Sequence, residues 1–191
     1  MASNSIFHSS SDENSWVIHI TQIFNSLDHE IQSIPVCVFH VPKSLSSAKP
    51  EAYVPQLIAL GPYHHFRPEL YPMERFKITA AKRILNLFKN IQLSQLIFEL
   101  EKLGPYIRAC YHKYLDLKDD TLACIMAIDS LFFLDLLHGY AKIENNGEQM
   151  SHLVHTRGVK LTKDAILRDV LMLENQIPFV VLRKIFTIIC T

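Results

Sequence analysis

The chain has 191 residues, of which 49% are apolar and 20% are charged, and its 19 lysines and arginines equal its 19 aspartates and glutamates in number. These values indicate a globular domain with its own core and exclude a disordered chain. The neutral balance also argues against nucleic-acid binding, which depends on clustered positive charge, and only five glycines disfavour a turn-rich all-β fold.

The N-terminal third predicts a tail, one helix and one small β element. Residues 1–15 are polar and predict a disordered tail that lacks the features of a secretory signal. Over 16–31, apolar residues recur at steps of three and four, which predicts an amphipathic helix that ends before Pro35. The short apolar runs 36–41 and 56–60 flank a proline-rich loop and predict one short β-hairpin near residues 36–60.

The rest of the chain predicts helices. Apolar periodicity places them at about 72–90, 93–103, 106–115, 120–140, 162–174 and from 178 onward, with a linker over 144–160. Asp119 and Asp120 are candidate N-caps, and Pro178 suits a first helical turn. We therefore predict a mainly α fold, an irregular multi-helix bundle.

The stretch 122–137 is apolar on almost every side, which is typical of a helix in the interior of a bundle. Asp129 lies within it and must be paired, hydrogen-bonded or protonated, because a bare buried charge is too costly. Charged residues interrupt this stretch and the stretch 177–190, so we expect no membrane span in this chain.

The four cysteines are scattered along the chain. None lies within four residues of another, so there is no Cys-x-x-Cys motif; they are Cys37, Cys110, Cys124 and Cys190. In a domain of this size the pattern favours reduced thiols over a disulfide framework, and hence a cytoplasmic location.

Five strings occur in a fixed order between about residues 53 and 182: IALGPYHH, MERFK, IRACY, IDSLFFLDLL and DVLMLENQIPFVVL. Together they resemble the plant family known as domain of unknown function 247. The chain departs from the family pattern at Ser130-Leu131-Phe132, where members often have Gly-Cys-Phe, and at Phe66, where they often have glycine.

The resemblance carries further expectations. Family members have no established biochemical activity, typically run to more than twice this length, and often end in a hydrophobic membrane-anchoring helix. Residues 16–191 would then be the truncated N-terminal portion of a single helical domain, and full-length relatives would associate with the plasma membrane. Some members are implicated in pollen self-incompatibility, which implies recognition and not metabolism.

The adjacent histidines His64 and His65 follow a Gly-Pro-Tyr turn and are the first candidates for chemistry. Further metal ligands after folding are His40, His112, His138, Asp135 and Glu174. A zinc site prefers four ligands, and the sequence has neither His-x-x-x-His nor His-Glu-x-x-His, so we expect no metal and no cofactor.

Other polar groups have a structural and a functional interpretation. Asp135 and His138 lie three residues apart on a predicted helix and could form a catalytic dyad, but no nucleophile motif accompanies them, so we expect simple pairing. Cys110 or Cys124 would serve as a nucleophile only if folding brings a histidine to it.

The triplet Glu174, Asn175 and Gln176 interrupts two apolar runs. It either faces a ligand or, as we favour, satisfies backbone groups at a helix–helix junction. We expect Arg108 to be the buried partner of Asp129 or Glu174, and its replacement by alanine to lower the melting temperature by many degrees. Glu74 and Lys77 predict a modest surface pair.

These expectations favour a non-enzymatic module that recognises an unidentified protein through apolar helix faces, including the face of the helix at 178–190. One alternative is a hydrolase-like or metal-dependent enzyme that uses the His64/His65 turn with a buried carboxylate. Another is a truncated family member with no function of its own.

Overall fold

The computed structural model describes residues 10–26, 34–88, 91–146, 155–156, 159–160 and 163–190. Helices dominate these residues, which confirms the predicted mainly α fold. In chain order the elements are α1 (Ser10–Ser26), α3 (Lys43–Ala48), α4 (Pro50–Tyr53), the 3-10 helix η1 (Pro68–Met73), α5 (Glu74–Leu87), α6 (Leu93–Glu101), α7 (Gly104–Ala109), α8 (Asp119–Asn146), the antiparallel pair β1 (His155–Thr156) and β2 (Val159–Lys160), α9 (Lys163–Val170) and α10 (Phe179–Cys190).

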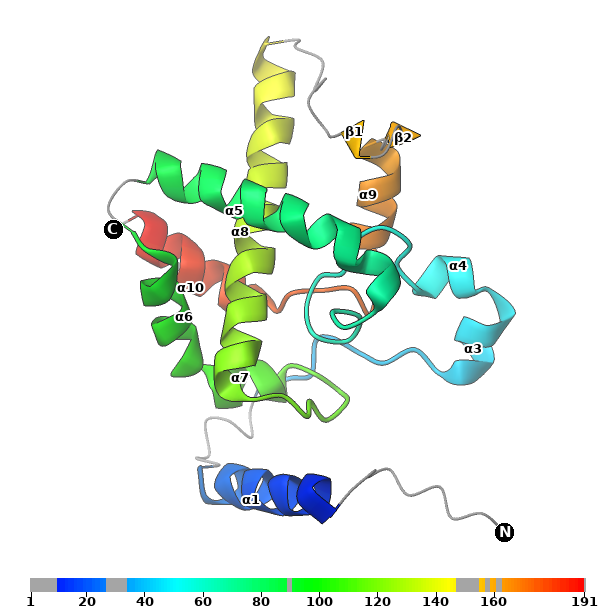
Figure 1. The fold of residues 1–191 in the computed structure, drawn as a ribbon, viewed down its shortest axis with the longest axis vertical. Coiled ribbons are helices and arrows are strands. Elements are labelled where there is room, and N and C mark those ends of the chain that lie inside the picture. The colour runs from blue at the N-terminus through cyan, green and yellow to red at the C-terminus, as the bar shows by residue number, and fades with distance from the viewer. Residues whose placement is uncertain are drawn as a thin grey trace.

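The long helix α8 is the centre of the bundle. It runs through the middle of Figure 1, where α5 crosses it and α6 and α10 lie along one side. By length and composition alone the stretch Asp119–Gly139 could cross a membrane, but 56% of that apolar window is buried inside the protein. This is the behaviour of a core helix, as its apolar character on nearly all sides predicts.

Two apolar clusters form on α8. The larger cluster joins α6, α7 and α10 to α8 around side chains such as Leu100, Ile107, Met126 and Ile185. The smaller cluster joins α5, α9 and the segment 58–60 to α8 around Phe132. The polar groups described below lie where the segment 56–61 passes between α5, α8 and α9.

The predicted β-hairpin near 36–60 does not form. Val38 makes a single parallel bridge to Tyr111, and the two short apolar runs do not pair with each other. The run 56–60 forms no strand: residues 56 and 57 lie in a bend, and side chains satisfy part of the backbone of this run. The apolar pattern therefore wrongly predicted a strand here.

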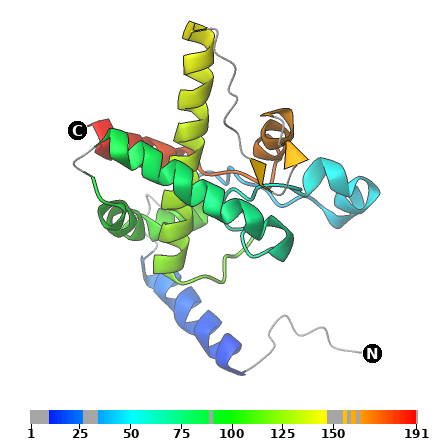
Figure 2. The same cartoon turned by 45° about the horizontal axis from the view of Figure 1, so that its top comes forward.

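Several helix ends differ from the predicted ones. Helix α1 begins at Ser10, so part of the predicted tail is helical, while residues 1–9 and 27–33 lie outside the described residues. Of the predicted linker over 144–160, residues 144–146 belong to α8, residues 155–156 and 159–160 form β1 and β2, and the rest lies outside the described residues. Helix α8 starts at Asp119 and extends to Asn146, beyond the predicted 120–140. In both views α1 lies at the edge of the molecule (Figures 1 and 2).

Helix α9 ends at Val170, four residues earlier than the periodicity predicted. Its last carbonyl groups accept hydrogen bonds from side chains further along the chain: Asn175 bonds the carbonyl of Asp169, and Gln176 bonds those of Val170 and Met172. These side chains satisfy the unpaired acceptors of a helix end, so the helix stops where they arrive.

Candidate functional site

A buried ion pair joins α5 to α8. The Nζ atom of Lys77 lies 2.5 Å from Oδ1 of Asp129, and neither side chain is exposed. Nζ also lies 2.7 Å from Oε1 of Glu74 and donates to the carbonyl of Ala59 at 3.1 Å, so each of its three protons has an acceptor. Burial alone would lower the pKa of Lys77, but the charges of Asp129 and Glu74 outweigh it and the pKa is raised.

The second oxygen of Asp129 connects this pair to the segment 56–61. Its Oδ2 atom accepts the backbone N–H of Gly61 at 2.8 Å. Burial raises the pKa of Asp129, and the neighbouring Lys77 opposes that rise. The carboxylate expected to need a partner therefore has two, both donated by other parts of the chain.

The carboxylate of Asp169 satisfies the backbone of the bend at residues 56–58. Its Oδ2 atom accepts the backbone N–H groups of Gln56, Leu57 and Ile58 at 2.9, 2.6 and 3.1 Å. An unpaired N–H inside a protein is costly, and one charged acceptor satisfies three of them. Its Oδ1 atom is buried without a hydrogen-bond partner.

Asn175 holds the next part of the segment. Its Oδ1 atom accepts the N–H of Leu60 at 2.6 Å, and its Nδ2 atom donates to the carbonyls of Ile58 at 2.9 Å and Asp169 at 2.8 Å. Both amide hydrogens and the amide oxygen are thus used. We refer to the four side chains that hold the segment 56–61 as the polar clamp: Lys77, Asp129, Asp169 and Asn175.

Gly61 allows the chain to change direction where it leaves the polar clamp. Its φ angle is +73°, and an added Cβ would lie 2.5 Å from the carbonyl oxygen of Gln176 and 2.8 Å from the hydroxyl of Tyr111. That hydroxyl donates to the same carbonyl at 2.9 Å. Only glycine suits both the backbone angle and the close approach.

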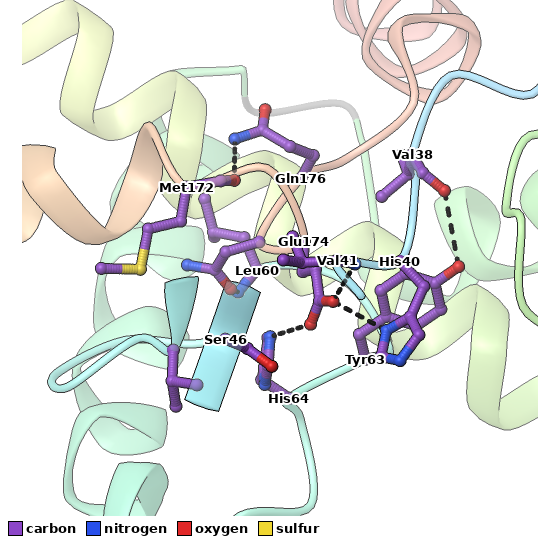
Figure 3. A network of polar contacts seen from close by, with 12 residues as sticks. Val38, His40, Val41, Ser46, Leu60, Tyr63, His64, Met172, Glu174 and Gln176 are labelled. Atoms are coloured by element: carbon purple, nitrogen blue, oxygen red, sulfur yellow. Dashed lines mark hydrogen bonds and ion pairs between the residues drawn. The ribbon is translucent and has the colours of Figure 1, made fainter. Parts of the chain in front are cut away.

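Glu174 lies between two histidines (Figure 3). Its Oε1 atom accepts the N–H of Val41 and lies 2.7 Å from Nδ1 of His40, while Oε2 lies 3.2 Å from Nε2 of His64. The second contact is within ion-pair distance but lacks the alignment of a hydrogen bond, since this Nε2 has no hydrogen-bond partner. Burial lowers the pKa of His64, Glu174 opposes this, and Arg67 adds to it.

His65 takes no part in that group. Its Nδ1 atom is buried without a hydrogen-bond partner, and its ring stands edge-on to Phe66 at 4.8 Å between centroids. Burial and the charge of Lys77 lower the pKa of His65. The structure brings His64 to Glu174 but does not bring both histidines to one carboxylate, as the enzyme hypothesis required.

Within the described part of the chain, no group of three or more histidine, cysteine, aspartate or glutamate side chains is placed to hold a metal ion. Among the candidate ligands, His40 contacts Glu174 directly, and His112 and His138 are exposed. Asp135 pairs with Arg83 of α5 instead of with His138. The Nη2 atom of Arg83 donates to Oδ2 of Asp135 at 2.6 Å, and Nε donates to Oδ1 at 3.1 Å.

The prediction that Arg108 pairs with Asp129 or Glu174 is wrong. Arg108 contacts Asp119 at 2.7 Å and donates to the carbonyls of Leu115 and Leu117 at 2.7 and 2.5 Å. Helix α7 ends one residue after Arg108, and the loop to α8 then folds back over the guanidinium group. Its side chain is therefore satisfied locally and holds that loop.

The predicted pair of Glu74 and Lys77 exists, but not at the surface, because Lys77 is completely buried. Sequence reasoning also missed Asp169. A signal for it was present: Ile166, Asp169 and Val170 follow the i, i+3, i+4 spacing of one helix face, so a carboxylate stands among apolar residues there. The bonds of Asn175 and Gln176 are those that the helix-junction interpretation predicted.

An apolar surface adjoins this polar group. A pocket is lined by Leu60, Phe133, Val170, Gln176, Ile177 and Leu182. Phe179 and Phe186 are 75% and 58% exposed, and each is about one helical turn from Leu182. The turn after α9 adds two more exposed side chains. We call this set the α10 surface: the pocket together with Leu171, Leu173, Phe179 and Phe186.

The order of the motifs and the bundle they build can now be compared with known proteins. The sequence pattern of the family described as plant protein of unknown function, domain of unknown function 247, matches residues 38–191. The chain belongs to this family. Its match takes in the polar clamp, Gly61, Glu174 and α10, and starts near the point where the N-terminal region joins the bundle.

Two curated relatives come from Arabidopsis thaliana. The UPF0481-type protein At3g02645 is 37% identical over 177 residues, which cover 91% of this chain. A second UPF0481 protein, At3g47200, is 28% identical over 166 residues, which cover 78% of it. The chain spans only 31% of the length of each relative. No solved structure gives a significant match.

Proposed function

We propose that this member of the plant family is a non-enzymatic protein-interaction module. The polar clamp fixes the path of the chain, and the α10 surface receives a partner. In support, the buried ionisable groups of the clamp, Lys77, Asp129 and Asp169, contact backbone groups or one another, as groups with a structural role do.

The α10 surface is the observation that carries the proposal. Large apolar side chains rarely gather around a pocket on a protein surface without a binding role. Aromatic side chains such as Phe179 and Phe186 contribute strongly to binding when a partner buries them. Both side chains are exposed on one side of α10, beside Leu182. This arrangement suits the binding of an apolar segment of a partner protein.

The occupant we propose is an apolar segment from the part of a family chain that lies outside this match. The matched region makes up 31% of each Arabidopsis relative, so these relatives carry a large further region whose packing partner is open.

The same proposal treats α8 as a core helix in place of a membrane span, because Asp129 at its centre is paired with Lys77. It also assigns the chain to the cytoplasm, in keeping with its free thiols.

The test uses the purified chain and the separately produced remainder of At3g02645 in isothermal titration calorimetry. Phe179→Ser combined with Phe186→Ser should weaken binding by roughly tenfold or more, because two aromatic contacts are lost. Phe66→Ser combined with Ile78→Ser is the matched control, since these exposed apolar residues lie away from α10, and it should bind normally. Equal affinity of both double variants, or no binding at all, would overturn the proposal.

Self-association is the competing outcome. Sedimentation of the chain alone over a range of concentrations should give a monomer at every concentration. A dimer that the Phe179/Phe186 double variant abolishes would mean that a second copy, and not the remainder of a family chain, occupies the α10 surface.

A further inference from the structure

Cys37 and Cys110 are neighbours in space although they are far apart in the sequence. The backbone N–H of Cys37 donates to the carbonyl of Cys110 at 2.9 Å, and the N–H of Val38 donates to the same oxygen at 3.0 Å. The N–H of His112 returns a bond to the carbonyl of Val38 at 3.0 Å. Val38 and Tyr111 form a parallel bridge, and Cys37 and Cys110 directly precede its two members. Backbones bridged in this way lie about 4.7–4.9 Å apart, which is within the roughly 4.4–6.8 Å Cα separation that a disulfide needs.

The two thiols differ in their access to solvent. Cys37 is exposed and Cys110 is buried, at the end of α7. The thiols are also close enough to influence each other: burial raises the pKa of Cys110 to about 12, and the Cys37 thiol adds to that rise through its charge and a hydrogen bond. A small reagent can therefore reach the first thiol, and the second stands directly behind it.

We propose that Cys37 and Cys110 form a thiol–disulfide exchange site that reacts with a small disulfide such as oxidised glutathione and ends in a Cys37–Cys110 cross-link. The exposed thiol makes the first attack and the buried thiol resolves the intermediate. Cys124 and Cys190 are also exposed and free, but the thiol contact that the proposal uses joins Cys37 to Cys110.

The exchange balances as two displacements. The Cys37 thiolate attacks one sulfur of oxidised glutathione, which forms a mixed disulfide and releases one glutathione thiolate that takes up a proton. Cys110 then loses its proton and attacks the sulfur of Cys37, which releases the second glutathione. The protein loses two electrons and two protons, and both appear in two molecules of reduced glutathione. The second displacement should be the slower one and should accelerate with rising pH, because the buried thiol yields few thiolates.

The cross-link would fasten the segment 34–41 to the end of α7. That segment brings His40 and Val41 to Glu174, so the bond would anchor one wall of the polar group. A disulfide that closes a long loop restricts the unfolded chain. The midpoint of thermal unfolding should therefore rise by several degrees on oxidation and return to its first value with dithiothreitol.

The test incubates the purified chain with oxidised glutathione and follows it by intact mass and non-reducing peptide mapping. The natural chain should yield the Cys37–Cys110 peptide pair. Cys110→Ala should instead accumulate glutathione on Cys37, and Cys37→Ser should leave Cys110 unmodified. Cys124→Ser is the matched control and should cross-link as the natural chain does.

Circular dichroism of each variant verifies that it is folded before the chemistry is compared. A natural chain that keeps glutathione on Cys37 without forming the link, or that links a different pair, would overturn the proposal. So would a Cys110→Ala variant that takes up no glutathione at Cys37.

Discussion

Lys77 and Asp129 belong to different helices, and their charged atoms lie 2.5 Å apart where neither side chain reaches solvent. Removing two charges from water costs about as much as their mutual attraction returns, so such a pair adds little net stability over apolar residues of the same size. What the pair does is positional. It sets α5 against α8 and, through Ala59 and Gly61, fixes where the segment 56–61 passes between them.

Replacement of Lys77 by methionine should lower the free energy of unfolding by about 3–5 kcal/mol, because it leaves the buried charge of Asp129 without its cation. Urea denaturation followed by circular dichroism measures this change. Lys82→Met is the matched control on the same helix, where the side chain is exposed, and it should change stability by less than about 0.5 kcal/mol. A similar small effect for both variants would contradict the positional role of Lys77.

Replacement of Asp169 by alanine should destabilise the protein by about 3 kcal/mol or more, since three backbone N–H groups lose their acceptor. Asp169→Asn should cost less, because an amide oxygen can still accept. Asp164→Ala, an exposed position at the start of the same helix, should be nearly neutral. Urea denaturation ranks the three variants, and an equal effect of the asparagine and alanine changes would mean that the acceptor is not what matters.

The helical part of this fold follows from local patterns. The apolar spacing placed α5, α6 and α10 within a few residues of their observed positions, and the nearly uniform apolar character of 122–137 identified the core helix. Helix ends were harder, because α9 stops where Asn175 and Gln176 reach its carbonyls, and that contact depends on the tertiary fold.

The polar site was predictable only in part. The sequence marked Asp129 as a buried carboxylate in need of a partner, but helix periodicity cannot say which distant cation meets it, and Arg108 was the wrong choice. The short apolar run 56–60 could not show that it bends and that side chains, not a partner strand, bind its backbone. Such pairings depend on how the helices pack and leave no periodic trace in the sequence.

The protein should lose stability as the pH falls below about 6.5, the ordinary pKa of histidine. Burial lowers the pKa of His64 and of His65, so the unfolded chain takes up protons that the folded chain resists. The stabilising contribution is therefore complete above pH 6.5 and is lost as the pH falls toward the lowered pKa values. Each histidine can contribute a slope of at most about 1.4 kcal/mol per pH unit.

Urea denaturation between pH 5 and pH 8 measures this dependence. His64→Gln should flatten the profile over that range, because one of the two resisting groups is gone, even if stability at pH 8 also changes. His138→Gln, at an exposed position on α8, should leave the slope as it is. A profile with the natural slope in the His64 variant would show that its proton binding does not differ between the folded and unfolded states.

Gly61 offers the sharpest test of how closely the segment 56–61 approaches the junction after α9. Replacement by alanine should destabilise the protein by at least about 2 kcal/mol, because a φ of +73° is unfavourable for alanine and the new methyl group would lie 2.5 Å from the carbonyl oxygen of Gln176. Gly104→Ala is the matched control: its added Cβ would meet Asp119 at an ordinary 3.5 Å. Thermal unfolding should distinguish Gly61→Ala from Gly104→Ala. The new methyl group of Gly61→Ala pushes directly on the Gln176 carbonyl. Its loss of stability should therefore shrink when Tyr111→Phe removes the hydroxyl that also crowds the site. Additive losses in the double variant would mean that the Tyr111 hydroxyl does not contribute to the need for glycine at this position.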